Sequence, residues 1–131
     1  MSESEEKKKV LVLVADDEEN LLLLVKDNLE EYGFEVRVAT NGQEALDNLS
    51  QKKPDIIILD VEMPKLNGWQ VCERIRKNPE LKDVPILILS AYAQPEDIKK
   101  GLSLGANHYL TKPFKIADLV QTIRKYSAPK L

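Results

Sequence analysis

Acidic, hydroxyl and basic side chains follow the apolar runs of this sequence at the points where those runs end. Asp16 and Asp17 follow the first run, Asp60 follows the third, Ser90 ends the fourth, and Lys112 comes shortly after the fifth. Carboxylates that gather in one place repel one another unless positive charge lies among them. Lys112 supplies one such charge, and Mg²⁺, which prefers carboxylate, water and phosphate oxygens, is the natural second. The set therefore suits a site that handles a phosphoryl group, with an aspartate as the nucleophile.

Strand-like and helix-like segments alternate along the chain and must position these side chains. Short apolar runs predict strands at residues 10–15, 34–39, 56–59, 86–89 and 108–110. Apolar residues at helical spacing predict helices over residues 18–32, 41–50, 64–77, 94–104 and 116–126. Such alternation demands parallel strands joined by right-handed helical crossovers, and five such units are too few for a closed barrel. The predicted fold is therefore α/β, with a single doubly wound five-stranded parallel sheet.

The order of the strands decides whether the chemical side chains meet. Three of the runs are continuous stretches of Val, Ile and Leu, as in strands covered by helices on both faces, whereas residues 34–39 alternate like an edge strand. In open parallel sheets, sites form beyond the carboxyl ends of the strands. With the order 2-1-3-4-5, the first and third strands are neighbours. Asp16, Asp17 and Asp60 would then crowd one rim of the sheet.

Each of these residues also has an ordinary structural interpretation. Asp16 and Asp17 could cap the helix that follows them, because carboxylates favour helix N-termini. Asp60 could be a solvated strand end, Ser90 a turn residue and Lys112 a surface lysine. What favours a site is that all of them fall at the carboxyl ends of strands within one alternating pattern.

The composition of the chain bounds its surroundings and partners. The 131 residues are 43% hydrophobic and carry a net charge of −3, which suits one soluble domain and disfavours a nucleic-acid binder. No apolar run approaches the ~18 residues of a transmembrane helix. The single cysteine, Cys72, excludes an internal disulfide framework and a cysteine-rich zinc site. We therefore expect a cytoplasmic protein that contacts neither nucleic acid nor membrane directly.

Four short motifs occur in a specific order and at specific separations. They are Asp16-Asp17, the segment LDVEMP at 59–64 with Gly68 after it, Ser90-Ala91, and the segment YLTKPF at 109–114. This set resembles the response-regulator receiver domains of two-component signalling, including the stand-alone chemotaxis regulators. The resemblance covers nearly the whole chain and implies a flavodoxin-like (βα)5 fold with the strand order 2-1-3-4-5. It places a receiver domain at residues 9–127, between a charged N-terminal tail at 1–8 and a C-terminal tail at 128–131.

The resemblance also assigns roles around the acidic rim. Asp60 would be the phosphoacceptor, which takes a phosphoryl group from the phosphohistidine of a sensor histidine kinase. Asp17 and Asp60 would be direct Mg²⁺ ligands, together with the main-chain carbonyl of Glu62. Asp16 would act mainly through metal-bound water. Lys112 would pair with the phosphoryl oxygens.

A second group of residues would form the switch. By the same resemblance, Ser90 would hydrogen-bond the new phosphate, Tyr109 would turn inward as Ser90 moves, and the bond between Lys112 and Pro113 would be cis. Tyr92, the second residue after Ser90, occupies a position that flanks the phosphoryl site in the family. It is either a barrier to attacking water or an ordinary exposed aromatic residue.

A run of four leucines precedes Val25 in the first predicted helix. Leu21, Leu24 and Val25 fit the buried stripe of that helix, whereas Leu22 and Leu23 fall partly off it. One interpretation is a wide buried stripe, and the other is a partner patch beside the acidic rim. The resemblance favours the patch, because receiver domains dock kinase helices along their first helix.

The predicted function is that of a signalling switch rather than an enzyme. Phosphorylation of Asp60 would require Mg²⁺ and would control a downstream protein target or a phosphotransfer protein. A stand-alone regulator, a phosphorelay intermediate and a domain of a longer protein all fit this prediction. The alternative is a phosphatase with an aspartyl-phosphate intermediate on a related α/β sheet, although residues 16–18 read Asp-Asp-Glu where haloacid-dehalogenase-like phosphatases have Asp-x-Asp. A flavodoxin-like cofactor binder is disfavoured, because the acidic run at 16–19 would repel phosphate.

Overall fold

Strands and helices alternate strictly along the part of the chain that the structure describes. The structure is a computed structural model that describes residues 9–127, so the predicted tails at 1–8 and 128–131 lie outside the described residues. The elements are β1 (Leu11–Ala15), α1 (Glu19–Glu31), β2 (Glu35–Ala39), α2 (Gly42–Gln51), β3 (Ile56–Leu59), α3 (Gly68–Lys77), β4 (Ile86–Ser90), α4 (Pro95–Ser103), β5 (His108–Thr111) and α5 (Ile116–Ser127). Most of their boundaries lie within one or two residues of those predicted from the sequence.

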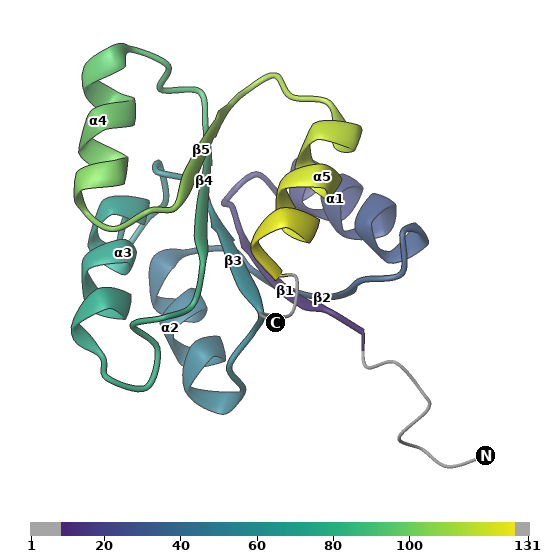
Figure 1. Cartoon of the computed structure of the whole chain (residues 1–131), viewed down its shortest axis with the longest axis horizontal. Helices are drawn as coiled ribbons and strands as arrows, with labels where there is room; N and C mark the ends of the chain where they lie inside the picture. Colours follow the sequence, from purple (N-terminus) through teal and green to yellow (C-terminus); the bar gives the residue numbers. More distant parts are fainter. Residues whose placement is uncertain (1–8, 128–131) are drawn as a thin grey trace.

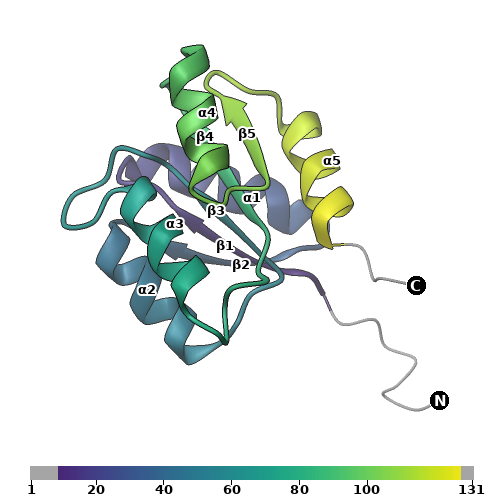
Figure 2. The same cartoon turned by 60° about the vertical axis from the view of Figure 1, so that its left-hand side comes forward.

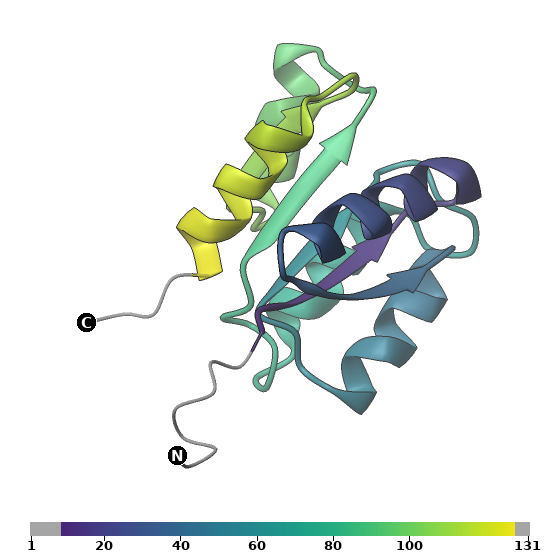
Figure 3. The ribbon, with the colours of Figure 1, turned by 90° about the vertical axis from the view of Figure 1, so that its right-hand side faces the viewer.

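The strands form one parallel five-stranded sheet in the order β2-β1-β3-β4-β5, which confirms the predicted order 2-1-3-4-5. Helices cover both faces of the sheet. α1 and α5 lie on one face, and α2, α3 and α4 lie on the other (Figure 1). Figure 3 shows α1 and α5 in front of the sheet that they cover. β2 is an edge strand, as its alternating pattern predicts.

Two hydrophobic clusters, one on each face of the sheet, explain why the central strands are apolar without interruption. In β1, Leu13 and Ala15 pack in the cluster beneath α2 and α3, whereas Val12 and Val14 pack in the cluster beneath α1 and α5. Successive side chains of a strand point to opposite faces, so neither face of β1 meets water. Full burial of each Val or Leu side chain contributes roughly 1.5–3 kcal/mol to the stability of the fold.

The beginning of α3 differs from the prediction of a helix over 64–77. Lys65 has a φ of 70°, and the main-chain nitrogen of Leu66 donates a hydrogen bond to the Pro64 carbonyl at 2.8 Å. This tight turn prevents a helix from forming at residues 64–66, because a positive φ is incompatible with a right-handed helix. The helix starts only at Gly68, where Asn67 and Gln70 form a reciprocal capping box. Residues 60–67 are consequently left as a loop at the rim of the sheet.

The buried face of α1 also differs from the prediction. Leu22 is 3% exposed and packs in the cluster with Val25 and Leu29, whereas Leu23 and Leu24 are each 56% exposed. The prediction that Leu22 is a surface contact is therefore wrong, and so is the placement of Leu24 in the buried stripe. The stripe runs through positions i, i+3 and i+7 starting from Leu22. A run of four leucines fits several such stripes equally well, so periodicity alone could not choose among them.

Among residues 9–127, no helix combines the length and the apolar character that crossing a membrane requires.

Candidate functional site

The ends of β1 and β3 bring the predicted carboxylates together. Ala15 pairs with Leu59 in the sheet register, so Asp16 and Asp60 leave the sheet side by side. The main-chain nitrogen of Asp60 donates a hydrogen bond to the Ala15 carbonyl at 2.9 Å, so the pairing of β1 with β3 continues up to Asp60. One carboxylate oxygen from each of Asp16, Asp17 and Asp60 lies within 4.8 Å of the others. The three acidic residues therefore meet at one rim, as the predicted strand order requires.

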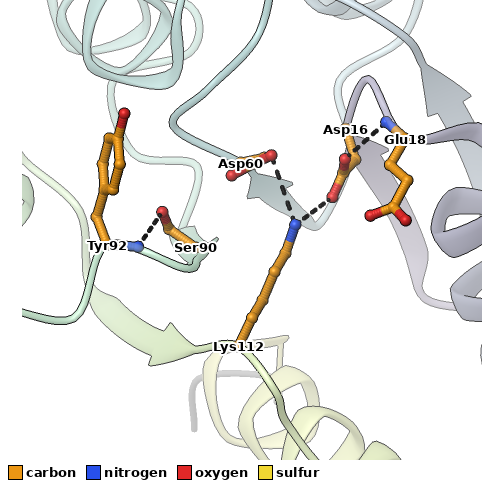
Figure 4. Close-up of polar contacts among 6 residues, drawn as sticks. All are labelled: Asp16, Glu18, Asp60, Ser90, Tyr92 and Lys112. Carbon is orange, nitrogen blue, oxygen red and sulfur yellow. Dashed lines mark hydrogen bonds and ion pairs between the residues drawn. The ribbon is translucent and has the colours of Figure 1, made fainter.

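Lys112 reaches the same rim from the end of β5. Its Nζ lies 2.8 Å from Asp16 Oδ2 and 3.5 Å from Asp60 Oδ2 (Figure 4). The Lys112 main-chain nitrogen donates to the Ser90 carbonyl at 2.8 Å, and the peptide bond to Pro113 is cis, as the resemblance implied. The lysine thus joins β5 and β4 to the acidic cluster that β1 and β3 provide.

Burial sets the electrostatics of this cluster. Asp16 and Asp60 are 4% and 7% exposed, whereas Asp17 faces solvent. Burial raises the pKa of Asp60 from 3.8 to about 6, against the opposing charge of Lys112 and with the help of the neighbouring Asp16. Burial also acts to lower the pKa of Lys112, but its pairing with Asp16 and Asp60 outweighs this and leaves that pKa raised. Lys112 is therefore a stable cation.

The donor set fits a hard divalent cation. With the three aspartates ionised, their three negative charges and the one lysine charge leave two negative charges in a cleft of about 300 Å³, and the carboxylates of Glu18 and Glu62 in its lining add two more. The lining of this cleft is Asp16, Asp17, Glu18, Asp60, Glu62, Ala91 and Lys112. Oxygen ligands of this kind suit Mg²⁺, which keeps several waters and takes one or two carboxylates.

The three carboxylates are not equally free to bind a metal. Asp16 Oδ1 accepts a hydrogen bond from the Glu18 main-chain nitrogen at 2.9 Å, and Asp16 Oδ2 accepts one from Lys112 at 2.8 Å. Both Asp16 oxygens are therefore engaged, as Figure 4 shows. Among residues 9–127, no hydrogen bond to the Asp17 carboxylate is present, so Asp17 and Asp60 are the carboxylates best able to take a metal directly.

The main chain of Tyr92 links Ser90 to Tyr109. Ser90 is 1% exposed, and its Oγ accepts a hydrogen bond from the Tyr92 nitrogen at 3.1 Å. Tyr109 is half-buried, and its Oη donates to the Tyr92 carbonyl at 2.6 Å. The sequence indicated Ser90 and Tyr109 but not this link, since a main-chain group carries no signature in the residue type. The Tyr92 side chain is exposed and points away from Ser90 (Figure 4).

The raised pKa of Asp60 predicts a particular pH dependence of the metal-free protein. Between pH 3.8 and about 6, Asp60 is protonated in the folded state but has lost its proton in the unfolded chain. The free energy of unfolding should therefore fall across that window and level off above it, by up to ~3 kcal/mol for a shift of about two pKa units. Asp60→Asn should remove this part of the fall and unfold at a higher temperature at neutral pH.

Thermal midpoints in EDTA at a series of pH values check this expectation. Subtracting the curve of Asp60→Asn from that of the parent isolates Asp60 from the other titrating groups. A difference that does not grow between pH 4 and pH 6 would contradict the assigned burial of the Asp60 charge.

Comparison with known proteins agrees with this geometry. Residues 12–124 match the response regulator receiver domain family. The chain is 39% identical over 101 residues to the DNA-binding dual master transcriptional regulator RpaA of Synechocystis, a match that covers 77% of this chain and 42% of that protein. The chain thus spans less than half the length of that curated relative.

Solved receiver structures superpose on nearly the whole chain. The chemotaxis response regulator CheY4 of Vibrio cholerae is 33% identical with a TM-score of 0.85, covering 91% of this chain and 99% of that one. A sensor histidine kinase receiver domain from Pseudomonas aeruginosa, 27% identical, has a TM-score of 0.86 over 93% of this chain and 100% of that one. In that domain a magnesium ion is coordinated in the active site cleft. The chain belongs to the response-regulator receiver domain family of two-component signalling.

Proposed function

We propose that this protein is a phosphorylation-activated switch in which Asp60 accepts a phosphoryl group from the phosphohistidine of a sensor histidine kinase. The observation that carries the proposal is the position of the Asp60 carboxylate, buried at the end of β3 with Lys112 Nζ 3.5 Å away and two further aspartates in the same cleft. A nucleophile beside a fixed cation is what phosphoryl transfer needs. The receiver domain proposed for residues 9–127 contains every residue of this site.

The transfer itself exchanges one bond to phosphorus for another. An Asp60 carboxylate oxygen attacks phosphorus, the bond between phosphorus and the histidine nitrogen breaks, and the imidazole leaves. The product is an acyl phosphate on Asp60. Lys112 offsets the charge on the phosphoryl oxygens, and its existing ion pairs hold it in position for this role.

The residues that would hold Mg²⁺ in this reaction are Asp17, Asp60 and the main-chain carbonyl of Glu62. Asp16, whose two oxygens already accept hydrogen bonds, would act through a metal-bound water. The ion, when bound, supplies positive charge that offsets the clustered carboxylates and the phosphoryl oxygens. The pairing of Asp16 with Lys112 supports this division of roles, because it leaves Asp16 without a free oxygen.

The response to phosphorylation would begin at Ser90. A phosphoryl group on Asp60 offers the Ser90 hydroxyl an acceptor, and Ser90 would turn away from the Tyr92 nitrogen to reach it. The loop that carries Tyr92 would then shift, and Tyr109, which donates to the Tyr92 carbonyl, would turn inward with it. The contact of Ser90 with the phosphoryl group is thus the interaction that differs between the two states.

The Ser90→Ala variant should therefore accept a phosphoryl group on Asp60, but the conformational response at Tyr109 should be weaker than in the parent. The substitution removes one hydroxyl from a buried position and leaves Asp60 and Lys112 untouched. We expect labelling by acetyl phosphate close to that of the parent, with smaller NMR shift changes around Tyr109 when a phosphoryl mimic is added. Shift changes equal to those of the parent would show that Ser90 does not couple Asp60 to Tyr109.

The kinase is proposed to dock on α1 beside the acidic rim. Leu23 and Leu24 are large apolar residues exposed on this helix, whereas Leu22, which the sequence suggested, is buried. α1 begins at Glu19, two residues after Asp17, so a helix bound to these leucines would approach the site. We place the docking contact on Leu23 together with Leu24.

The output of the switch is proposed to be a protein rather than nucleic acid. The net charge of −3 supports this, because proteins that bind a phosphate backbone are normally basic. A chemotaxis-like regulator or a phosphorelay intermediate is the form we propose, on the likeness to CheY4. The downstream partner is then a target protein or a phosphotransfer protein.

A phosphatase with an aspartyl-phosphate intermediate remains the alternative, and one experiment separates the two functions. The protein is incubated with acetyl phosphate and Mg²⁺, and with acetyl phosphate and EDTA, and its intact mass is recorded. A switch gains one phosphoryl unit per chain with Mg²⁺ and releases no phosphate from p-nitrophenyl phosphate. Repeated turnover of that ester by the parent, lost in Asp60→Asn, would favour the phosphatase.

A further inference from the structure

Arg76, near the end of α3, donates hydrogen bonds to two neighbouring loops. Its Nε donates to the Gly105 carbonyl at 2.9 Å, and its Nη1 donates to the carbonyls of Lys82 and Val84 at 2.9 and 2.7 Å. Its Nη2 donates to Asn107 Oδ1 at 2.9 Å. The guanidinium therefore joins α3 to the loop before β4 and to the turn between α4 and β5. This junction lies at the amino end of β4 and β5, opposite the acidic rim.

The acceptors on the α4–β5 turn are themselves fixed. The Asn107 nitrogen donates to the Ile86 carbonyl, and Asn107 Oδ1 accepts from the Ile86 nitrogen, both at 2.8 Å. Tyr126 of α5 donates to the Asn107 carbonyl at 3.0 Å. Gly105 has a φ of 110°, and an added Cβ would lie 2.6 Å from Arg76 Cγ, so the turn has no room for a side chain there. We call Arg76, Gly105 and Asn107 the α4–β5 clamp.

The clamp is strong because the charged Arg76 guanidinium donates four hydrogen bonds. Arg76 is half-buried, and burial lowers its pKa. Within the described part of the chain, Arg76 takes part in no ion pair, so its four hydrogen-bond acceptors replace the water that it has lost. Hydrogen bonds from a charged donor are stronger than neutral ones, and a planar guanidinium holds several acceptors in a fixed geometry.

The other end of α4 is held much more loosely. Gly101 is the one buried residue of this helix, and it lies against Ile88, Tyr109 and Trp69 in the helix's second half. Residues 91–96, which lead into the helix, are all exposed. The Tyr109 hydroxyl holds this leading segment through the Tyr92 carbonyl. Figure 2 shows α4 beside β5 and the turn that connects them, which contains Gly105 and Asn107 of the clamp.

We propose that the α4–β5 clamp is the fixed pivot of the switch, about which the N-terminal end of α4 moves when Asp60 is phosphorylated. This inference rests on the proposed function. The contacts that phosphorylation would change, those of Ser90 and Tyr109 with Tyr92, lie at the loose end of α4. Because the clamp prevents the other end from following, a small shift at Tyr92 becomes a rotation of the helix. Arg76 is thus a positioning residue that acts through α4.

Trp69 gives this rotation a direct readout. It is the only tryptophan of the chain, it contacts Gly101, and Lys100 Nζ of α4 lies 5.2 Å from the centre of its ring. A rotation of α4 changes both contacts and hence the emission of Trp69. Beryllofluoride with Mg²⁺ serves as the phosphoryl mimic, and the emission change that it produces measures how far α4 responds.

The test compares Arg76→Met with Arg74→Met, an identical change at an exposed position of the same helix. In Arg76→Met, the amides of Gly105 and Ala106 should exchange with solvent about tenfold faster, as expected when a hydrogen bond from a charged group is lost. The emission change of Trp69 should be smaller than in the parent, because the α4–β5 turn can then move with α4 and the helix rotates less. Labelling of Asp60 by acetyl phosphate should match the parent in both variants, and Arg74→Met should match it throughout.

The outcomes separate the pivot from the proposed function. Faster exchange together with a full Trp69 response would show that the clamp is merely structural and would overturn the pivot alone, as would exchange equal to that of the parent. A parent that takes no phosphoryl group would overturn the proposed function and the pivot with it. If Arg76→Met does not fold, Arg76→Lys, which keeps the charge but not the planar fork, carries the same test with a smaller expected loss of response.

Discussion

Asp17→Ala is expected to abolish Mg²⁺ binding, whereas Asp16→Ala weakens it without abolishing it. Asp17 is exposed at the rim with a carboxylate that accepts no hydrogen bond within residues 9–127, and with Asp60 it is one of the two aspartates that we propose as direct ligands of the ion. Mg²⁺ retains most of its waters in proteins and depends on very few protein ligands. Loss of one of them should push binding beyond the measurable range.

Asp16→Ala removes a residue that pairs with Lys112 and for which we propose a role through metal-bound water. Partners of this indirect kind typically contribute about 10–100-fold to metal affinity, so a residual affinity should remain. Titration calorimetry with MgCl₂ measures both variants, and Glu19→Ala, which removes an exposed carboxylate from the first turn of α1, is the matched control. Equal affinities for the parent and Asp17→Ala would refute the assigned ligand.

Leu22→Ala should strongly lower the stability of the fold, whereas Leu23→Ala should hardly change it, although the two leucines are neighbours in the sequence. Leu22 is 3% exposed inside the cluster beneath α1, so its truncation should destabilise the fold by ~2–5 kcal/mol. Leu23 is 56% exposed, so its truncation should change stability by no more than ~0.5 kcal/mol. Denaturant unfolding of the two variants measures this contrast.

The rate of phosphoryl transfer from the kinase tests the proposed docking role of Leu23. An apolar residue at the centre of an interface can contribute ~2 kcal/mol or more to binding, so Leu23→Ala should slow phosphoryl transfer from the cognate kinase domain. Labelling by acetyl phosphate, which needs no docking, should remain as in the parent. Transfer from the kinase at the parental rate would remove Leu23 from the docking surface.

The fold could be predicted from the sequence because two patterns agree. Continuous apolar runs such as residues 56–59 indicate strands buried on both faces, and the helical spacing between runs indicates crossovers, so little freedom of topology remains. The meeting of Asp16, Asp17 and Asp60 then follows from the strand order, since the carboxyl ends of parallel strands share one edge.

The parts that could not be predicted depend on tertiary choices that leave weak marks in a sequence. The four leucines before Val25 fit several helical stripes, and only packing against the sheet selects Leu22. The late start of α3 depends on a positive φ at Lys65, a residue type that rarely adopts one. The main-chain link at Tyr92 has no residue-type signature at all.

The central claim is that Asp60 is the phosphoacceptor, and intact mass spectrometry tests it most directly. The parent, Asp60→Asn and Asp27→Asn, which changes an exposed aspartate of α1, are incubated with acetyl phosphate and Mg²⁺ and measured before the acyl phosphate hydrolyses. We predict that the parent and Asp27→Asn each gain one acid-labile phosphoryl unit and that Asp60→Asn gains none. A phosphoryl adduct on Asp60→Asn equal to that on the parent would contradict the assignment.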